Sequence, residues 1–148
     1  MADDTFCVLP WVHAATLTDG SVQLCCVSGG GSGVNLNEQT LADYWNSDYV
    51  KDARRRMLAG RKVKACSRCY VQEALGRRSH RIVENEVWQA RLGADTIHEL
   101  TAQTAADGSL LGSTHWNSSS SFCQGCRLIG IVLREEARPG TMSRVNRC

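Results

Sequence analysis

The stretch FCVLPWVHAATLTDGSVQLCC (residues 6–26) and the later tetrapeptide CSRC (residues 66–69) decide the fold of this chain. Together they place cysteines at separated points of the sequence, which a fold can gather into one tetrahedral site. Thiolates arranged in this way are the ligands that soft metal ions and iron–sulfur clusters require. The first hypothesis is therefore a metal or cluster site.

The first stretch predicts a β-hairpin. Asp19-Gly20 suits the positive φ values of a type I′ turn, and it lies between the segments 14–17 and 21–26. In the predicted register Cys25 faces Ala14. Side chains alternate along a strand, so Cys25 and Cys26 point to opposite faces. The pattern favours Cys26 as a buried core residue and leaves Cys25 free to bind.

Helices are predicted after the glycine-rich loop 27–33. Thr40 begins a capping box ahead of a short helix, and Ser47 is placed to cap a second helix over 48–59 that ends at Gly60. The second helix is expected to bury Val50, Ala53 and Met57 and to direct Arg54 and Arg55 away from the core. Cys66 opens a further helical run that ends near Leu75, and residues 81–92 form the next helix.

The pattern weakens beyond residue 93. Residues 94–113 show little periodicity, residues 118–121 are a run of serines, and only residues 128–133 resemble a buried strand. The expected organisation is a domain over residues 5–93, followed by a weakly structured tail over residues 94–148.

The composition of the chain indicates in which cell compartment it resides and what kind of partner it could bind. The 148 residues include eight cysteines, and the N-terminus is acidic where a signal peptide would be basic and then apolar. The chain is interpreted as cytosolic with reduced thiols, and no apolar run is long enough for a membrane anchor. Residues 51–81 are strongly basic, which favours the solvated side of helices and leaves a nucleic-acid footprint or a docking face for an acidic partner as alternatives.

The joint spacing of cysteines and neighbouring motifs resembles the SPASM/Twitch auxiliary-cluster domain of radical SAM proteins. Cys7 is followed by twelve residues, Gly20, four residues and Cys25, and a C-x-x-C pair comes about forty residues later. The residues that carry the resemblance are Phe6-Cys7-x-x-Pro10-Trp11-x-His13, Asp19-Gly20-Ser21-Val22, Cys25-Cys26, Trp45-Asn46-Ser47, Met57-Leu58-Ala59-Gly60 and Cys66-x-x-Cys69-x-x-x-Glu73. The resemblance covers about residues 5–88.

The resemblance implies an α+β fold in which a short β-hairpin is followed by helices around one [4Fe-4S] cluster. The implied ligands are Cys7, Cys25, Cys66 and Cys69, with Cys26 as a neighbour. In the family such a cluster is auxiliary. It passes electrons or holds a peptide or small-molecule substrate beside the catalytic domain that cleaves S-adenosylmethionine.

The sequence also departs from radical SAM proteins. The C-x-x-x-C-x-x-C loop that binds the catalytic cluster is missing, and Cys123-x-x-Cys126 followed by a short run to Cys148 does not replace it. This chain alone is therefore not expected to perform radical chemistry. It is interpreted as a detached or truncated auxiliary domain, with a tail that could derive from a shifted reading frame.

Alternative readings remain open for several residues. Four thiolates also suit structural zinc, which gives a second hypothesis: a zinc-stapled module that binds nucleic acid through residues 54–56, Arg61, Lys62 and Lys64. Cys123 and Cys126 are interpreted as surface thiols rather than as partners of Cys66 and Cys69.

Other polar residues are given structural roles. His13 is expected to be a hydrogen-bonded structural residue, and Glu73 to form a helix-face ion pair with Arg77 or a neighbouring lysine. Trp11, Trp45 and Trp88 are expected to fill the core. No arrangement of a serine or cysteine hydrolase stands out.

Overall fold

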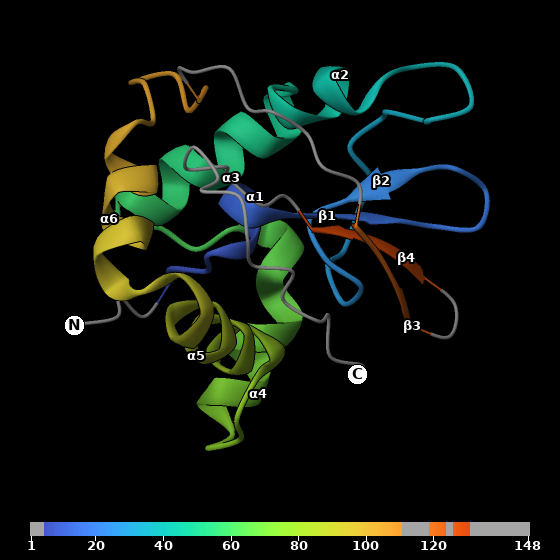
Figure 1. Cartoon of the computed structure of the whole chain (residues 1–148). Coiled ribbons are helices and arrows are strands. Elements are labelled where there is room, and N and C mark those ends of the chain that lie inside the picture. Colours follow the sequence, from blue (N-terminus) through green and yellow to red (C-terminus); the bar gives the residue numbers. More distant parts are fainter. Residues whose placement is uncertain (1–4, 111–118, 124–125, 131–148) are drawn as a thin grey trace, which may run out of the picture.

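The computed structural model describes residues 5–110, 119–123 and 126–130. A short helix and a hairpin come first, helices follow, and a second pair of strands comes last (Figure 1). The elements are α1 (Leu9–Val12), β1 (His13–Thr16), β2 (Val22–Gln23), α2 (Leu41–Trp45), α3 (Asp48–Leu58), the 3₁₀ helix η1 (Lys64–Cys66), α4 (Ser67–Ala74), α5 (His80–Leu92), α6 (Ala94–Ala102), β3 (Ser119–Cys123) and β4 (Cys126–Gly130). The predicted fold class, a small hairpin followed by helices, is confirmed.

The hairpin forms, but its register differs from the prediction. Ala15 pairs with Gln23, and β2 ends there, so Cys25 lies in the bend after the strand and not opposite Ala14. The turn is also of another type. Of the two predicted central residues, Asp19 and Gly20, only Gly20 has a positive φ, of 87°, whereas a type I′ turn requires positive values at both. The carboxylate of Asp19 instead accepts hydrogen bonds from the backbone and hydroxyl of Ser21.

The helix boundaries follow local capping. Thr40 and Asp43 form the predicted capping box at the start of α2, and the left-handed Gly60 follows α3. Ser79 caps α5 by accepting a hydrogen bond from the amide of Ile82. Along α3, the predicted inward residues Val50, Ala53 and Met57 are all buried.

The core lies around α1 and β1. Trp11, Trp45 and Trp88 are buried, as predicted, together with Tyr44 and Met57. Helix α3 packs against α1, and α5 packs against α6 (Figure 1). The side chain of Asn85 on α5 holds the N-terminus of α1 by bonding the backbone of Phe6 and Val8.

Arg54 is the main departure within α3, because its side chain is fully buried and not directed away from the core. Its guanidinium donates hydrogen bonds to the carbonyl oxygens of Pro10 and Trp45, both at 2.9 Å, and of Gly108 at 3.4 Å. It also lies over the ring of Trp45. Burial lowers the pKa of Arg54 to about 10, so the group stays charged at neutral pH. One side chain therefore joins α1, the α2–α3 junction and the 104–110 turn.

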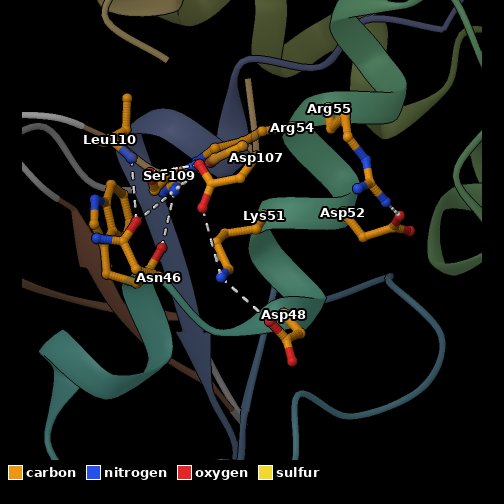
Figure 2. Close-up of polar contacts among 11 residues, drawn as sticks. Asn46, Asp48, Lys51, Asp52, Arg54, Arg55, Asp107, Ser109 and Leu110 are labelled. Carbon is orange, nitrogen blue, oxygen red and sulfur yellow. Dashed lines mark hydrogen bonds and ion pairs between the residues drawn. The ribbon is translucent and has the colours of Figure 1, made fainter. Parts of the chain in front are cut away.

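Residues 94–110 contain more regular structure than the sequence pattern predicts. Helix α6 buries Leu100, and the indole of Trp11 donates a hydrogen bond of 2.8 Å to the hydroxyl of Thr104. Figure 2 shows the turn that follows, where Asn46 accepts a hydrogen bond from the amide of Leu110 and Lys51 lies between Asp48 and Asp107. The boundary expected at residue 93 therefore falls just before a helix and a turn that contact the core.

Gly108 fits this turn for a steric reason. Its φ is +90°, and an added Cβ would lie 2.1 Å from the backbone carbonyl oxygen of Lys51. Only glycine combines that conformation with so close an approach.

Strands β3 and β4 extend the sheet to the order β2-β1-β4-β3, with antiparallel pairing throughout. Most of the serine run expected to be poorly ordered therefore lies in β3. Of the strand expected over residues 128–133, the first three residues belong to β4 and the rest lie outside the described residues. In the described part of the chain, every helix is too short or too polar to cross a bilayer.

Candidate metal centre

The four cysteines named by the motif spacing come from four different local structures. Cys7 lies two residues before the start of α1, Cys25 lies in the bend after β2, Cys66 ends η1, and Cys69 lies in the first turn of α4. All four line one small pocket, together with Leu9, Val27, Ser28, His80 and Arg81. Their side chains are buried and form no disulfide. The fold thus brings together thiols that are up to 62 residues apart.

Backbone and hydroxyl hydrogen bonds hold the segments that carry these thiols. The hydroxyl of Ser28 bonds both the amide and the carbonyl of Cys25, and the amide of Gly29 bonds the carbonyl of Ala65 at 2.7 Å. The phenol of Tyr70 accepts from the amide of Val63 and donates to the carbonyl of Thr5. The loop after β2, η1 and the N-terminal segment are therefore tied to one another around the pocket.

The pocket disfavours negative charge on sulfur. Burial raises the pKa of Cys25 to about 11 and that of Cys66 to about 12, and it raises the pKa of Cys7 well above its ordinary value. Mutual repulsion among the thiolates adds to each of these shifts. Binding four thiolates here requires positive charge among the sulfur atoms, which a metal centre brings.

Arg81 supplies a positive charge at the pocket wall. It is 6% exposed, donates to the carbonyl of Phe6 at 2.7 Å, and pairs through two nitrogens with the carboxylate of Glu73. Although burial opposes both charges, the mutual hydrogen bonds lower the pKa of Glu73 and raise that of Arg81. The prediction that Glu73 forms an ion pair with Arg77 is therefore wrong. Helical spacing favoured Arg77, but Arg81 on α5 binds the carboxylate across elements.

We expect Arg81→Gln to destabilise the protein by about 2 kcal/mol, since hydrogen bonds to charged groups contribute roughly 1.5–3 kcal/mol and Glu73 would be left without its partner. Urea unfolding followed by circular dichroism measures the loss. The double variant Glu73→Gln/Arg81→Gln should recover part of it, because no lone charge remains. Arg78→Gln, which removes an exposed pair with Glu86, is the control and should cost less than about 1 kcal/mol. Equal losses for Arg78→Gln and Arg81→Gln would contradict this role.

Cys25 lies at the thiol pocket, as predicted, but Cys26 does not lie in the core. Cys25 is buried in the pocket, while Cys26 is exposed with its sulfur 3.8 Å from Nε2 of His80. The prediction that Cys26 is a core residue is therefore wrong. The reason is local: β2 ends at Gln23, so the alternation of faces does not continue to residues 25 and 26.

His13 is buried on β1 and is not among the residues that line the pocket. Burial, reinforced by repulsion from His80, lowers the pKa of His13 to about 4. The imidazole is therefore neutral in the folded protein at neutral pH.

The shift of His13 predicts a loss of stability in weak acid. The unfolded imidazole has a pKa of about 6.5, so the unfolded chain takes up the proton first, and stability falls as pH decreases from about 6.5 to about 4. Between pH 7 and pH 5 we expect the free energy of unfolding to fall by about 2 kcal/mol from this group. Urea unfolding at both pH values checks it. His13→Gln should show a correspondingly smaller change, and an unchanged pH dependence in that variant would rule out His13 as the cause.

The remaining metal candidates are less defined. In the part of the chain that the structure describes, no three His, Cys, Asp or Glu side chains are spaced to hold a single metal ion. The structure therefore relates the four thiols to one another only through the pocket that they line together. Cys123 and Cys126 are register partners at the ends of β3 and β4. Their assignment as surface thiols stays a prediction, and Cys148 lies outside the described residues.

The family comparison agrees with the motif spacing. Residues 7–70 match the model of the SPASM family, an iron–sulfur cluster-binding domain. We call this matched stretch the SPASM segment; it begins at Cys7 and ends one residue after Cys69. Comparisons with curated proteins and with solved structures found no match to the chain.

Several residues at or beside the thiol pocket could not be identified from the sequence. Arg81 lay within the basic block 51–81, but nothing in its local pattern separated it from the exposed cations around it. No sequence motif marked His80 or Ser28 as residues of the pocket. Tyr70 follows Cys69 directly, and that adjacency was the one available indication of its place beside the site.

Proposed function

We propose that Cys7, Cys25, Cys66 and Cys69 hold one [4Fe-4S] cluster. The observation that carries the proposal is that four cysteines distant in sequence line a single buried pocket within the SPASM segment. The donor set fits the group, because iron–sulfur clusters are held by four cysteine thiolates. When bound, such a cluster supplies one-electron transfer.

The protein residues would bind and shield the cluster. The aliphatic side chains of Leu9 and Val27 limit access of water, and burial together with hydrogen bonds near the sulfur atoms tunes the potential of such centres. Arg81 places a positive charge beside thiolates that would otherwise repel one another. These features support a site built for a bound group rather than for exposed reactive thiols.

We further propose that the module is auxiliary. SPASM domains occur in radical SAM proteins, so the expected partner is a radical SAM catalytic domain, and the expected role is electron transfer or substrate holding beside it. The residues 5–93 expected as the domain include all four proposed ligands. The helix and turn over 94–110 extend the packing around them.

The second hypothesis, a zinc-stapled module that binds nucleic acid, loses one of its proposed contacts. Arg54 is buried and occupied by carbonyl oxygens, while Arg55 and Arg56 both pair with Asp52 at 2.6 Å. The other cations that the second hypothesis requires are Arg61, Lys62 and Lys64. These three are exposed and form no ion pair with the described residues, so they stay open to phosphate groups.

Anaerobic purification of the full chain separates the two hypotheses. We expect brown protein with iron and acid-labile sulfide in equal amounts and about four of each per chain, from the composition of the cluster. Colourless protein that holds one zinc ion and binds an oligonucleotide with a steep salt dependence would overturn the proposal. Reconstitution with iron and sulfide under strict anaerobic conditions controls for loss of cluster during purification.

A further inference from the structure

A second depression lies on the outer side of the segment that carries Cys66 and Cys69. It has a volume of about 740 Å³ and is formed by α3, residues 62–65 and α4. Ligand sites in proteins are typically about 300–1,000 Å³. The family match assigns this depression no role. We call it the α3–α4 groove.

The floor of the α3–α4 groove is apolar. Tyr49, Val63, Ala65 and Tyr70 contribute to it, and Val71 stands beside them with 59% of its surface exposed. The exposed Val71 and the half-buried ring of Tyr49 give apolar area that a bound ligand would cover.

The rim of the groove is positively charged and incompletely neutralised. Arg56 and Asp52 line it, but Asp52 is held by both Arg55 and Arg56 at 2.6 Å. Lys62 and Lys64 also line it, are exposed, and have no ion-pair partner among the described residues. A ligand with carboxylates can pair with these two lysines.

The groove and the thiol pocket share a wall. Ala65, Ser67 and Tyr70 line the groove, whereas the interleaved residues Cys66 and Cys69 line the thiol pocket. Residues 65–70 therefore contribute to the groove with some side chains and to the thiol pocket with others. A ligand in the groove lies next to the centre that would exchange electrons with it or hold it.

We propose that the α3–α4 groove binds an acidic peptide segment, with carboxylates on Lys62 and Lys64 and apolar side chains on Tyr49 and Val71. This inference rests on the proposed function and names the substrate or partner class of that module. Nucleic acid fits less well. Lys62 lies 5.5 Å and Arg81 5.9 Å from the centroid of the Tyr70 ring, so cations already occupy the ring on which a base would stack.

The test uses the full chain, loaded with cluster under anaerobic conditions, and fluorescence anisotropy of a short labelled peptide that alternates Glu and Leu. Lys62→Glu/Lys64→Glu should weaken binding about tenfold or more. Arg61→Glu/Arg68→Glu changes the charge equally at exposed positions outside the groove, and it should weaken binding less than about threefold. Lys64→Glu alone, which leaves the Lys62–Tyr70 contact intact, should show an intermediate loss.

Three outcomes would overturn the groove assignment: no binding of the acidic peptide, equal weakening by the two double variants, or stronger binding of a peptide that alternates Lys and Leu. Competition by an oligonucleotide with the same dependence on Lys62 and Lys64 would also count against it. Iron and sulfide content is measured on every variant. Loss of cluster from the unsubstituted protein would refute the proposed function, whereas normal cluster content without peptide binding would refute only the groove.

Discussion

Replacing any one of Cys7, Cys25, Cys66 or Cys69 by serine is expected to remove the cluster, while Cys26→Ser leaves it in place. Serine is close to cysteine in size, so the substitution tests the sulfur ligand rather than the packing. Loss of a residue that merely supports a metal ligand costs about 10- to 100-fold in affinity, and loss of a ligand itself should cost more. Anaerobic reconstitution, visible absorption and iron and sulfide content measure the result.

Cys26 is the matched control because it adjoins Cys25 in sequence and is exposed outside the pocket wall. Circular dichroism of each variant separates loss of ligand from loss of fold. If Cys26→Ser lost the cluster and Cys25→Ser retained it, the assignment of these two neighbours would have to be exchanged. If all five variants retained it, the site would lie elsewhere.

Arg54→Met is expected to destabilise the protein by about 3 kcal/mol. Methionine has a similar length but donates no hydrogen bonds, so the carbonyl oxygens of Pro10, Trp45 and Gly108 lose their donor inside the core. An unsatisfied buried polar group costs about 1–3 kcal/mol, and breaking buried charged contacts costs roughly 3–5 kcal/mol. Because a domain is stable by only about 5–15 kcal/mol, urea unfolding should detect the change easily.

The control for Arg54 lies next to it on α3. Arg55 is exposed and pairs with Asp52 on its own helix, as Figure 2 shows, so Arg55→Met should change stability by less than about 1 kcal/mol. Arg54→Lys distinguishes charge from geometry. Lysine keeps the charge without the planar fork, and a loss close to that of Arg54→Met would show that the directed hydrogen bonds matter most. Similar stability of the Arg54→Met and Arg55→Met proteins would contradict the role assigned to Arg54.

Sequence could identify the cysteines of the pocket because their spacing is itself the pattern of the family. It could not determine the environment of Cys26, since β2 ends three residues before the predicted strand and the alternation of faces stops there. The partner of Glu73 was likewise beyond reach. Helical spacing considers neighbours on one helix, while Arg81 comes from another element and is placed by tertiary packing.

Helix existence was predictable where capping residues and apolar spacing agree, as at Thr40 and along α3. The inward position of Arg54 was not, because a charged side chain is normally assigned to the surface unless its buried acceptors are known. Helix α6 shows the same difficulty. Its only buried residue is Leu100, so local periodicity gave little indication of a helix held by its contacts with α5.

The contacts of Thr104 and Gly108 also bear on the order of events during protein synthesis. The N-terminal part of a chain leaves the ribosome first. Trp11 and Arg54 are then made well before Thr104 and Gly108, which accept their hydrogen bonds, so these bonds form only after the 104–110 turn has been made. All four pocket cysteines are translated before that moment. The contacts that join α1 and α3 to the 104–110 turn therefore form only after the complete set of pocket cysteines has been made.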